Sequence, residues 1–495
     1  MSTQREEAAM TEPEQAPLER PELDEPPLVV DLDGTLITAD LLDECASRFI
    51  TDSPLQLWRI PVWLLSGRLA LKQQLADRVR LDVPVLPYNV KLVEWLSGEY
   101  ERGRHLVLAS ASDQRIVDAV ANHLGIFDLA LGSHDDVNLK AEAKAAALVE
   151  RFGERGFDYI GNHRDDLAIW AHARTAHLVD PPDGLEQQAA ALTTIGQGFG
   201  WRGRHPVNQL WRAMRPHQWA KNVLIFIPLV TAQHFSASAV LHALLAFVSF
   251  CLVASGVYLL NDISDVENDR HHTTKRRRPF ASGRLRLAAG WMAWPFLTMA
   301  AFGLAAAALP WYFSMALLGY LVLTVTYTFW LKGRAVVDVV ALGGLYTARI
   351  IAGAAAISVP LSFWLLTYSL FIFLSLALIK RVSELTKLRL TGAAGKGRGY
   401  RASDLELLSS YGVASSIAAC VIFAIYVNSP STASLYAHPE LLWASLPIML
   451  SWLMRMWLLS HRGLMTEDPV LFAIRDRASL VAWVLLAAVF VAANL

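Results

Sequence analysis

Cysteine and charged residues are both scarce in this chain of 495 residues. The three cysteines, Cys45, Cys251 and Cys420, lie far apart without a Cys-x-x-Cys pair, which excludes a disulfide scaffold and a cysteine-ligated zinc site. Only 18% of residues are charged, against about 25% in ordinary soluble proteins. The formal net charge of −1 gives no global attraction for nucleic acid. With 54% hydrophobic residues, the chain is too apolar for an ordinary soluble protein and far too apolar for a disordered one.

The apolar residues are unevenly distributed along the chain. Residues 1–26 hold eight acidic and two basic residues with four prolines, which predicts a disordered acidic tail. This start lacks the apolar run of a secretory signal. We predict a soluble domain over residues 27–185, a linker over 186–206, and a membrane domain over 207–495.

The predicted soluble domain alternates between strand and helix patterns. The runs "PLVVDLDGTL", "HLVLASAS" and "FDYIGN" are short, apolar and end in polar turn residues, as buried parallel strands do. Amphipathic stretches such as "DQRIVDAVANHLG" separate them, and Gly125 is a suitable helix C-cap. Alternating strands and helices predict a doubly wound α/β sheet with its site at the carboxyl ends of the strands.

The second half of the chain contains long apolar segments, and a membrane helix needs about 20 such residues. We predict nine membrane helices, at about residues 207–232, 239–260, 288–308, 311–331, 335–357, 360–379, 407–428, 440–459 and 478–494. The fifth contains Arg349. An arginine inside a membrane segment is a functional candidate, facing a cavity or an anion.

Basic residues provide an independent test of this topology. Lys and Arg are absent from 222–269, 287–331, 402–454 and 478–495, and they gather in 270–286, 332–334, 380–401 and 455–477. Each basic loop follows an even-numbered predicted helix. The positive-inside rule then puts these loops and the α/β domain in the cytoplasm, and the C-terminus outside. We expect a multi-pass protein of a bacterial inner membrane.

The ends of the three predicted strands carry polar residues suited to phosphate chemistry. Asp31 and Asp33 are two apart, so one carboxylate can attack phosphorus while the other donates a proton. Ser110 ends the second strand and could hold a phosphoryl oxygen. Lys140 or Lys144, in "NLKAEAK", could neutralise phosphate charge. After the third strand, "GNHRDD" supplies Asn162 and Asp166, whose oxygens suit Mg²⁺.

This order of motifs over residues 28–180 resembles the haloacid dehalogenase superfamily, most closely its phosphoserine-phosphatase-type branch. The resemblance implies Asp31 as nucleophile, Asp33 as acid and base, and Ser110 with a lysine on the phosphate. It implies Mg²⁺ held by Asp31, the Asp33 carbonyl and the acidic loop, and a helical cap over residues 40–100. Asn162 stands where the family usually has aspartate, so Asp166 becomes the main acidic ligand of that loop. A catalytically inactive regulatory domain is the alternative.

A second acidic motif, "NDISDVENDRHHTTKRRRPFASGRL", follows the second predicted membrane helix. Its acidic and amide residues recur at spacings of three and four, which places them on one face of a helix. Oxygen ligands at a membrane surface suit Mg²⁺ bound to a diphosphate, and arginines can bind phosphate oxygens in pairs. The candidates are Asn261, Asp262, Asp265 and Asp269 for metal and diphosphate, and Arg270, Lys275, Arg276, Arg277 and Arg278 for phosphate. A simple positive-inside loop is the alternative.

On its nine predicted helices, this motif resembles the UbiA-type prenyltransferase superfamily, whose members bind a diphosphate through Mg²⁺ while a polyprenyl chain lies in the membrane. Within it, "RPHQWAKNV", which contains Lys221, and "YTFWLK" are similar to the branch of decaprenyl-phosphate phosphoribosyltransferase. That branch implies Tyr327 and Lys332 as candidates for binding a phosphosugar.

The charge of the region after the sixth predicted helix helps to distinguish an aromatic acceptor from a second anionic substrate. Aromatic prenyltransferases of the superfamily usually have a second aspartate-rich cluster there, whereas this chain has "IKRVSELTKLRL". Lys380 and Arg381 precede Glu384, the only acidic residue of this stretch. A basic cluster suits a second anionic substrate better than a neutral aromatic ring, although positive-inside charge also explains it.

We therefore expect a bifunctional enzyme that uses Mg²⁺. The membrane domain would transfer 5-phosphoribose from phosphoribosyl diphosphate to a polyprenyl phosphate, and the phosphatase domain would remove the remaining phosphate. One alternative is alkylation of an aromatic or other acceptor by a polyprenyl diphosphate. Another is a non-enzymatic lipid-binding protein with an inactive phosphatase domain. No nucleic-acid partner is expected, because the basic run is short and lies between membrane helices. The sequence does not give the oligomeric state.

Overall fold

The computed structural model describes residues 25–134, 137–200, 206–391, 399–430, 435–465 and 468–495. The predicted acidic tail lies almost entirely outside these residues. The chain forms two compact units, which are described separately. The first unit is Met1–Gln209 with Ser264–Ala288, and the second is Leu210–Ile263 with Ala289–Leu495.

The first unit contains a parallel sheet of six strands in the order β3-β2-β1-β4-β5-β6. The strands are β1 (Leu28–Asp31), β2 (Leu106–Asp113), β3 (Leu129–Ser133), β4 (Asp158–Gly161), β5 (Thr175–Val179) and β6 (Thr194–Phe199). In the register, Val30 of β1 lies beside Leu108 on one side and Ile160 on the other. The predicted doubly wound α/β fold is confirmed, and it brings the ends of β1, β2 and β4 together.

Each face of this sheet has its own hydrophobic core because consecutive strand residues point to opposite faces. Leu28 and Val30 pack in one core, whereas Val29 packs in the other. The helices that cover the sheet are α4 (Val90–Glu101), α5 (Gln114–Leu124), α6 (Glu142–Phe152), α7 (Leu167–Trp170) and α8 (Leu185–Ala190). Residues 186–206, predicted as a linker, thus contain most of α8 and all of β6, and β6 pairs with β5. The sheet extends beyond the predicted boundary at residue 185.

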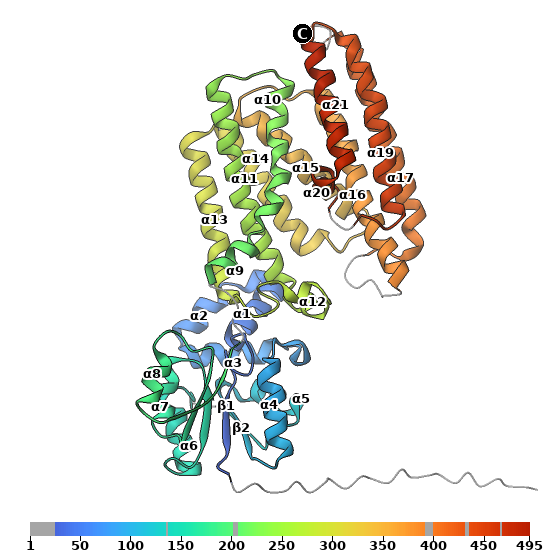
Figure 1. Cartoon of the computed structure of the whole chain (residues 1–495). Coiled ribbons are helices and arrows are strands. Elements are labelled where there is room, and N and C mark those ends of the chain that lie inside the picture. Colours follow the sequence, from blue (N-terminus) through green and yellow to red (C-terminus); the bar gives the residue numbers. More distant parts are fainter. Residues whose placement is uncertain (1–24, 135–136, 201–205, 392–398, 431–434, 466–467) are drawn as a thin grey trace, which may run out of the picture. The chain divides into compact units, whose positions relative to one another are not determined.

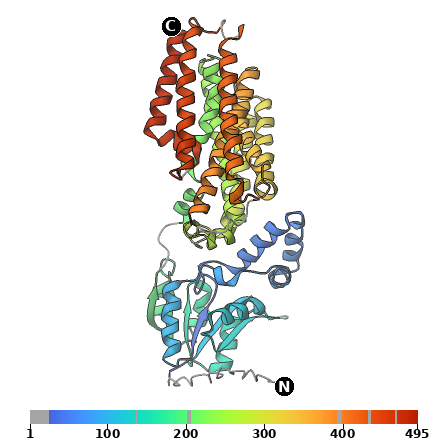
Figure 2. The ribbon, with the colours of Figure 1, turned by 90° about the vertical axis from the view of Figure 1, so that its right-hand side faces the viewer.

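A helical cap follows β1 (Figure 2). It consists of α1 (Leu41–Asp52), η1 (Pro54–Gln56), α2 (Arg59–Leu65), α3 (Arg68–Arg78) and η2 (Val83–Val85). The cap has a small core of its own, in which Cys45 and Phe49 of α1 pack against Leu71 and Leu75 of α3. The predicted cap reached residue 100, but Leu92 of α4 belongs to the core of the sheet, so α4 is part of the main layer.

The second unit is helical, and eight of its described helices are long and apolar enough to cross a membrane. They comprise α11 (Ala237–Ser264), α13 (Leu287–Ala308), α14 (Trp311–Thr326) continued by the π-helical turn η6 (Tyr327–Leu331), α15 (Val337–Ala356), α16 (Phe363–Thr391), η7 (Ala402–Asp404) with α17 (Leu405–Val427), η8 (Pro439–Ala444) with α19 (Ser445–His461), and α21 (Arg477–Asn494). A short helix, α20 (Pro469–Arg475), precedes α21. The chain is therefore an integral membrane protein.

The first predicted membrane helix, residues 207–232, is not a continuous helix. It consists of α9 (Pro206–Ala213), the 3₁₀ helix η4 (Pro216–Phe226) and α10 (Ile227–Thr231). Pro216 and Pro228 each lack the amide hydrogen that a continuous helix requires, and each stands near the start of a new segment. In the described residues, eight of the nine predicted spans correspond to helices long and apolar enough to cross a membrane, and residues 207–232 instead form three consecutive shorter helices.

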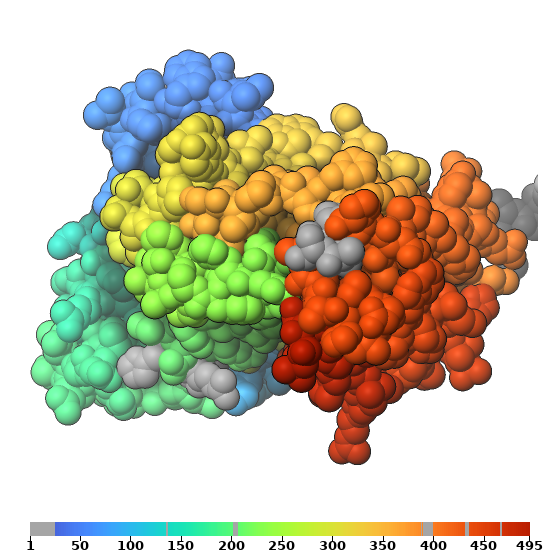
Figure 3. Space-filling model, turned by 90° about the horizontal axis from the view of Figure 1, so that it is seen from above, coloured from blue at the N-terminus to red at the C-terminus, as the bar shows by residue number. Residues whose placement is uncertain are grey.

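In the helical unit, the segment after α10 contacts the C-terminal part of the chain. Figure 3 shows the green segment around residue 235 beside the orange-red C-terminal helices. Gln233, after α10, donates a hydrogen bond from Nε2 to Oδ1 of Asn494 at 2.5 Å and to the carbonyl oxygen of Leu435 at 3.3 Å. A large hydrophobic core of this unit holds buried aromatic and aliphatic side chains of α15, α16, α17 and α19.

Candidate active sites

The first site is built around Asp31 at the end of β1. Its Oδ1 accepts a hydrogen bond from Nζ of Lys144 at 2.7 Å, and its Oδ2 accepts one from the hydroxyl of Thr35 at 3.3 Å. Lys144 is buried in the first turn of α6 and also donates to Tyr159. Burial raises the pKa of Asp31 to about 6, against the opposing effect of the Lys144 ammonium. The structure places Lys144 on the predicted nucleophile.

Lys140, the other predicted lysine, is directed elsewhere. Its ammonium pairs with Asp165 at 2.9 Å on the surface. The difference comes from the start of α6, which begins at Glu142 after Ala141 adopts a positive φ of 45°. Lys140 thus precedes the helix, whereas Lys144 lies on its inner face.

Asp33 is held by three hydrogen bonds. Its Oδ2 accepts hydrogen bonds from the hydroxyls of Ser110 and Ser112, both at 2.9 Å. Its Oδ1 accepts from the amide of Leu41, the first residue of α1, at 2.7 Å. Burial and the neighbouring Asp40 carboxylate raise the pKa of Asp33 to about 6. Ser110, predicted on the phosphate, therefore orients Asp33, and Ser112 has the same role.

The loop after β4 is organised by Asp166. Its Oδ2 accepts from the amides of Asn162 and His163 at 2.9 and 2.8 Å, and its Oδ1 accepts from Tyr159 at 3.0 Å. Asn162 donates from Nδ2 to the carbonyl oxygen of Gly34 at 3.0 Å. This hydrogen bond to Gly34, which follows Asp33 in the chain, fixes the orientation of the Asn162 side-chain amide.

The donor set of this site fits Mg²⁺ in chemistry. It consists of oxygen atoms from Asp31, the Asp33 carbonyl, Asn162 and Asp166, and Mg²⁺ prefers oxygen ligands. In the described part of the chain, no three Asp, Glu, His or Cys side chains converge as a metal cluster. A ligand set here thus depends on carbonyl and amide oxygens beside the carboxylates.

Lys72 of the cap is a further site residue that the sequence did not single out. Its Nζ lies 2.5 Å from the carbonyl oxygen of Ala111 and 3.4 Å from Oδ1 of Asn138. Burial lowers the pKa of Lys72, although the Asp33 carboxylate acts in the opposite direction. No pattern in "LALKQQLADR" distinguishes this lysine from a surface one. The cap therefore adds a second ammonium group near Asp33.

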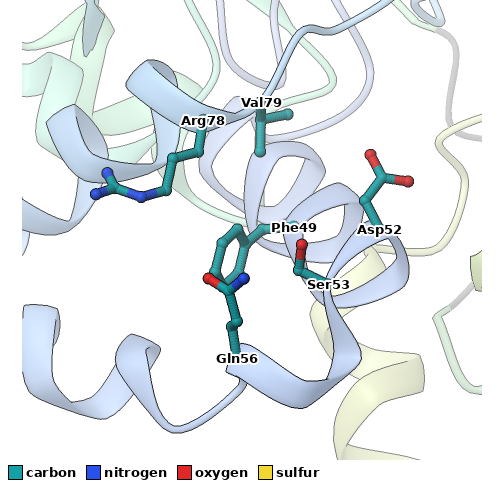
Figure 4. Close-up of a pocket in the computed structure, with 6 residues that line it drawn as sticks. All are labelled: Phe49, Asp52, Ser53, Gln56, Arg78 and Val79. Atoms are coloured by element: carbon teal, nitrogen blue, oxygen red, sulfur yellow. The ribbon is translucent and has the colours of Figure 1, made fainter.

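The cap also contains a pocket of about 300 Å³. Figure 4 shows Phe49 and Gln56 at its centre, with Arg78 and Val79 on the neighbouring α3 side. None of the residues that line it contacts Asp31 or Asp33. The pocket is separate from the site around Asp31 and Asp33.

The second predicted site begins in the helical unit with Asn261 and Asp262 near the end of α11. Asp262 is buried, and its Oδ1 accepts a hydrogen bond from Arg215 at 2.5 Å. The guanidinium of Arg215 also lies over the ring of Tyr258, at 5.5 Å from its centroid. Arg215 belongs to the "RPHQWAKNV" motif, which the structure therefore joins to the acidic motif.

The rest of the acidic motif belongs to the first unit, in α12 (Val266–His271) and η5 (Lys275–Arg277). Asp265 is the N-cap residue of α12, and its carbonyl oxygen accepts from the amide of Asp269 at 2.8 Å. Asp269 is buried, with Nη1 of Arg278 at 2.6 Å and Nζ of Lys275 at 4.0 Å. Arg276 lies in η5. Arg278, predicted to bind phosphate, thus pairs with Asp269, predicted to bind metal, within this segment.

Arg270, also predicted to bind phosphate, pairs with a carboxylate outside the motif. Its Nη2 and Nη1 donate to the two carboxylate oxygens of Glu44 in α1, at 2.6 and 3.0 Å. Its Nε donates to the carbonyl oxygen of Ala281 at 3.1 Å. Both charged side chains are buried, at 6% and 4% exposure. Arg270 holds the segment to the cap helix α1.

A cationic cluster lies in the interior of the helical unit around Asp468. Nζ of Lys221 and Nζ of Lys380 both approach its Oδ2, at 2.8 and 3.2 Å. Tyr346 donates to its Oδ1 at 2.9 Å. The three elements η4, α16 and the start of α20 thus bring two predicted phosphate ligands to a single carboxylate. Asp468 stands in the charged stretch "EDPVLFAIRDR" after the eighth predicted membrane helix.

Arg349, the predicted intramembrane cation, lies beside this cluster. Its Nε donates to Oδ1 of Asn222 at 2.9 Å and its Nη2 donates to the hydroxyl of Tyr320 at 3.0 Å. Its guanidinium lies over the rings of Tyr320 and Tyr346, at 5.0 and 5.5 Å from their centroids. Arg349 therefore joins α15 to η4 and α14 and adds positive charge near Lys221.

Arg381 forms a separate buried network. Its Nε donates to Asp338 at 2.5 Å, its Nη1 to Glu384 at 2.6 Å, and its Nη2 to the hydroxyl of Tyr327 at 3.0 Å. Tyr400 also donates to Asp338. The structure thus brings together Tyr327, Arg381 and Glu384 of the prediction and adds Asp338. Lys332 follows the π-helical turn that carries Tyr327.

A model of the UbiA prenyltransferase family matches residues 223–475, just over half of the chain. The chain belongs to this family. An "uncharacterized protein y4nM" of Sinorhizobium fredii is 38% identical over 475 residues, covering 94% of this chain and 91% of the relative. The decaprenyl-phosphate phosphoribosyltransferase of Mycolicibacterium smegmatis is 36% identical over 196 residues, covering 38% of this chain and 60% of that enzyme.

Solved structures resemble each part of this UbiA-family chain at low identity. A UbiA homolog from Archaeoglobus fulgidus bound to GPP and Mg²⁺ covers 58% of this chain and 99% of its own, with 15% identity and a TM-score of 0.45. A substrate-bound phosphoserine phosphatase covers 39% of this chain and 99% of its own, with 16% identity and a TM-score of 0.24. The family model confirms the expected UbiA-type membrane domain.

Proposed function

We propose that this membrane protein transfers 5-phosphoribose from phosphoribosyl diphosphate to a polyprenyl phosphate. The observation that carries the proposal is the cationic cluster around Asp468. Among the residues that the structure describes, Lys221, Lys380 and Arg349 bring three positive charges to the surroundings of the buried Asp468 carboxylate. Such an excess of cations suits two anionic substrates and has no use for a neutral aromatic acceptor. The similarity to decaprenyl-phosphate phosphoribosyltransferases supports the same reaction.

The acidic and basic motifs of the sequence support the following roles. Asp262, Asp265 and Asp269 would hold Mg²⁺, which would supply charge neutralisation for the departing diphosphate. Lys275 and Arg278, both near Asp269, would bind diphosphate oxygens. Lys221 and Lys380 would turn from Asp468 to the phosphate of the lipid, whose oxygen attacks the sugar carbon. The bond from that carbon to the diphosphate breaks as the new one forms.

The phosphatase domain would then remove the 5-phosphate from the lipid-linked product. Asp31 would attack phosphorus through Oδ2, because Lys144 occupies its Oδ1. Asp33, with a pKa raised to about 6, would protonate the departing ribose oxygen and later take a proton from the attacking water. Mg²⁺ on the oxygens of Asp31, Asn162 and Asp166 would neutralise phosphate charge. The fusion raises the effective concentration of the product for this second step.

The test is a transfer assay with full-length protein in detergent, Mg²⁺, polyprenyl phosphate and ribose-labelled phosphoribosyl diphosphate. We expect label in the lipid extract, and a loss of about 10²- to 10³-fold in Lys380→Met and Asp262→Asn. Arg462→Gln, at an exposed position after α19, is the matched control and should keep full activity. Unlabelled lipid together with activity on a polyprenyl diphosphate and an aromatic acceptor would contradict the proposal.

A further inference from the structure

The cap of the first unit carries an unusual concentration of exposed apolar side chains. Residues 54–68, here called the apolar cap segment, comprise η1, α2 and the turn into α3. Six large hydrophobic side chains of this segment are exposed: Leu55, Leu57, Trp58, Val62, Leu64 and Leu65. Leu55 and Leu65 are 88% and 90% exposed. Elsewhere in the described residues of the first unit, only four large hydrophobic side chains are exposed, and they are scattered along the chain at Val90, Val137, Leu192 and Val207.

The core of the cap does not account for this segment. Only Ile60 and Trp63 pack inward, against the cluster that contains Cys45 and Phe49. Neither η1 nor α2 has a buried residue. Soluble domains seldom expose contiguous apolar surface, and such patches mark sites of protein or membrane contact. The outward side chains of the segment thus require a partner.

Charge identifies which partner the apolar cap segment fits. Residues 53–76 contain no Asp or Glu, whereas Arg59, Arg68 and Lys72 are basic. The guanidinium of Arg59 lies over the ring of Trp58, at 5.5 Å from its centroid. Tryptophan with exposed leucines and flanking arginines is the composition of interfacial membrane segments, in which basic groups meet anionic headgroups.

We propose that the apolar cap segment inserts into the interface of a bilayer that contains anionic phospholipid. The seven residues of α2 are far too short to span a bilayer, so the segment lies in the interface. The eight candidate spans of the same chain keep a bilayer within reach at all times, which makes even a weak insertion effective. The next helix, α3, carries Lys72, so the inserted cap would hold the phosphatase site at the headgroup level. This insertion does not depend on which reaction the membrane domain catalyses.

The test uses nitroxide labels on the full-length protein in nanodiscs. Leu65→Cys labels the apolar cap segment, and Val90→Cys, an equally apolar exposed position in α4, is the matched control. The three native cysteines are buried and should not react. Relaxation by oxygen, which concentrates in lipid, is compared with relaxation by a water-soluble nickel chelate, in phosphatidylcholine alone and in an equal mixture with phosphatidylglycerol.

We expect the oxygen-to-nickel ratio at Leu65 to exceed that at Val90 severalfold, and to rise further in the anionic mixture. Replacing Arg59 and Arg68 with Gln should remove this further rise. Equal nickel accessibility at both positions would overturn the proposal, because the segment would then lie in water. Exclusion of both reagents at Leu65 would also overturn it, since the segment would then be covered by protein, from this chain or a second copy.

Discussion

Nζ of Lys144 lies 2.7 Å from Oδ1 of Asp31 and 3.2 Å from the carbonyl oxygen of Ala109, so one ammonium group joins α6 to the ends of β1 and β2. Because both charges are buried, removing the ammonium leaves the Asp31 carboxylate without its cationic partner at the proposed phosphate site. We predict that Lys144→Met lowers phosphate release by about 10²- to 10³-fold, since the lost group stabilises negative charge. Transfer by the membrane domain should persist, and a 5-phosphorylated lipid should accumulate.

Lys140→Met is the matched control for this prediction. It removes a lysine four residues away that forms only a surface pair with Asp165. Such pairs contribute about 0–1 kcal/mol, so phosphate release should change little. Mass spectrometry of the lipid product measures both variants. Equal losses in the two variants would show that Lys144 has no special role.

The buried pair of Arg270 with Glu44 leads to a second prediction. Glu44→Ala leaves the guanidinium unpaired in a buried position, which costs about 3–5 kcal/mol at such sites. We expect faster hydrogen exchange in residues 264–288 and reduced transfer, because α12 carries Asp269. Hydrogen exchange with mass spectrometry on the full chain measures the first effect.

Glu101→Gln, an exposed position at the end of α4, is the control for Glu44→Ala and should leave exchange unchanged. The exchanged pair Glu44→Arg with Arg270→Glu should recover part of the protection. Unchanged exchange in Glu44→Ala would mean that the pair does not hold the segment.

His177 in β5 predicts that the folding stability of the first unit depends on pH. Burial lowers the pKa of His177 to about 4, and its ring nitrogen accepts a hydrogen bond from the amide of Gln197. The unfolded chain binds the proton at about 6.5, so stability is full above that pH and falls as pH decreases from 6.5 towards 4. The loss amounts to about 3 kcal/mol. Hydrogen exchange of β5 and β6 against pH measures it.

His177→Gln should flatten this dependence, because the titrating group is gone. His105→Gln, at an exposed position, should retain the full slope. A slope that survives in His177→Gln would assign the acid sensitivity to other groups.

The sequence predicted the sheet and the strand-end residues well because both depend on local pattern. Asp31 and Asp33 follow a buried apolar run, and parallel strands place such ends at one edge. The choice between Lys140 and Lys144 depended instead on where α6 begins, which the positive φ of Ala141 decides. Local pattern does not encode that conformation.

The membrane unit shows a similar division between local and distant causes. Hydropathy located eight spans but did not show the breaks near Pro216 and Pro228. Hydropathy averaged over a window of residues does not register the backbone hydrogen bond that a proline cannot donate. The ion pair of Arg381 with Asp338 joins residues 43 positions apart. Partners so distant in sequence become neighbours only through helix packing, so the buried state of Arg381 could not be predicted.

Close packing at Gly353 gives the last prediction. A methyl group there would meet the carbonyl group of Ile225 in η4, with its carbon atom at 2.9 Å. Neither backbone can move freely, so Gly353→Ala should cost about 1–3 kcal/mol. Gly319→Ala in α14, where nothing lies within 4 Å, should instead keep or raise stability, because alanine favours a helix by about 1 kcal/mol. Resistance to proteolysis in detergent measures the difference.

The same substitution tests how η4 positions the cationic cluster. Lys221 lies four residues before Ile225 in the chain. Displacement of η4 by the new methyl group would therefore carry Lys221 away from Asp468. We therefore expect Gly353→Ala to raise the KM for the polyprenyl phosphate more than it lowers kcat. If stability falls while both kinetic constants stay at their original values, Lys221 does not bind the lipid phosphate, and the anion site must be sought around Lys380 and Arg349 instead.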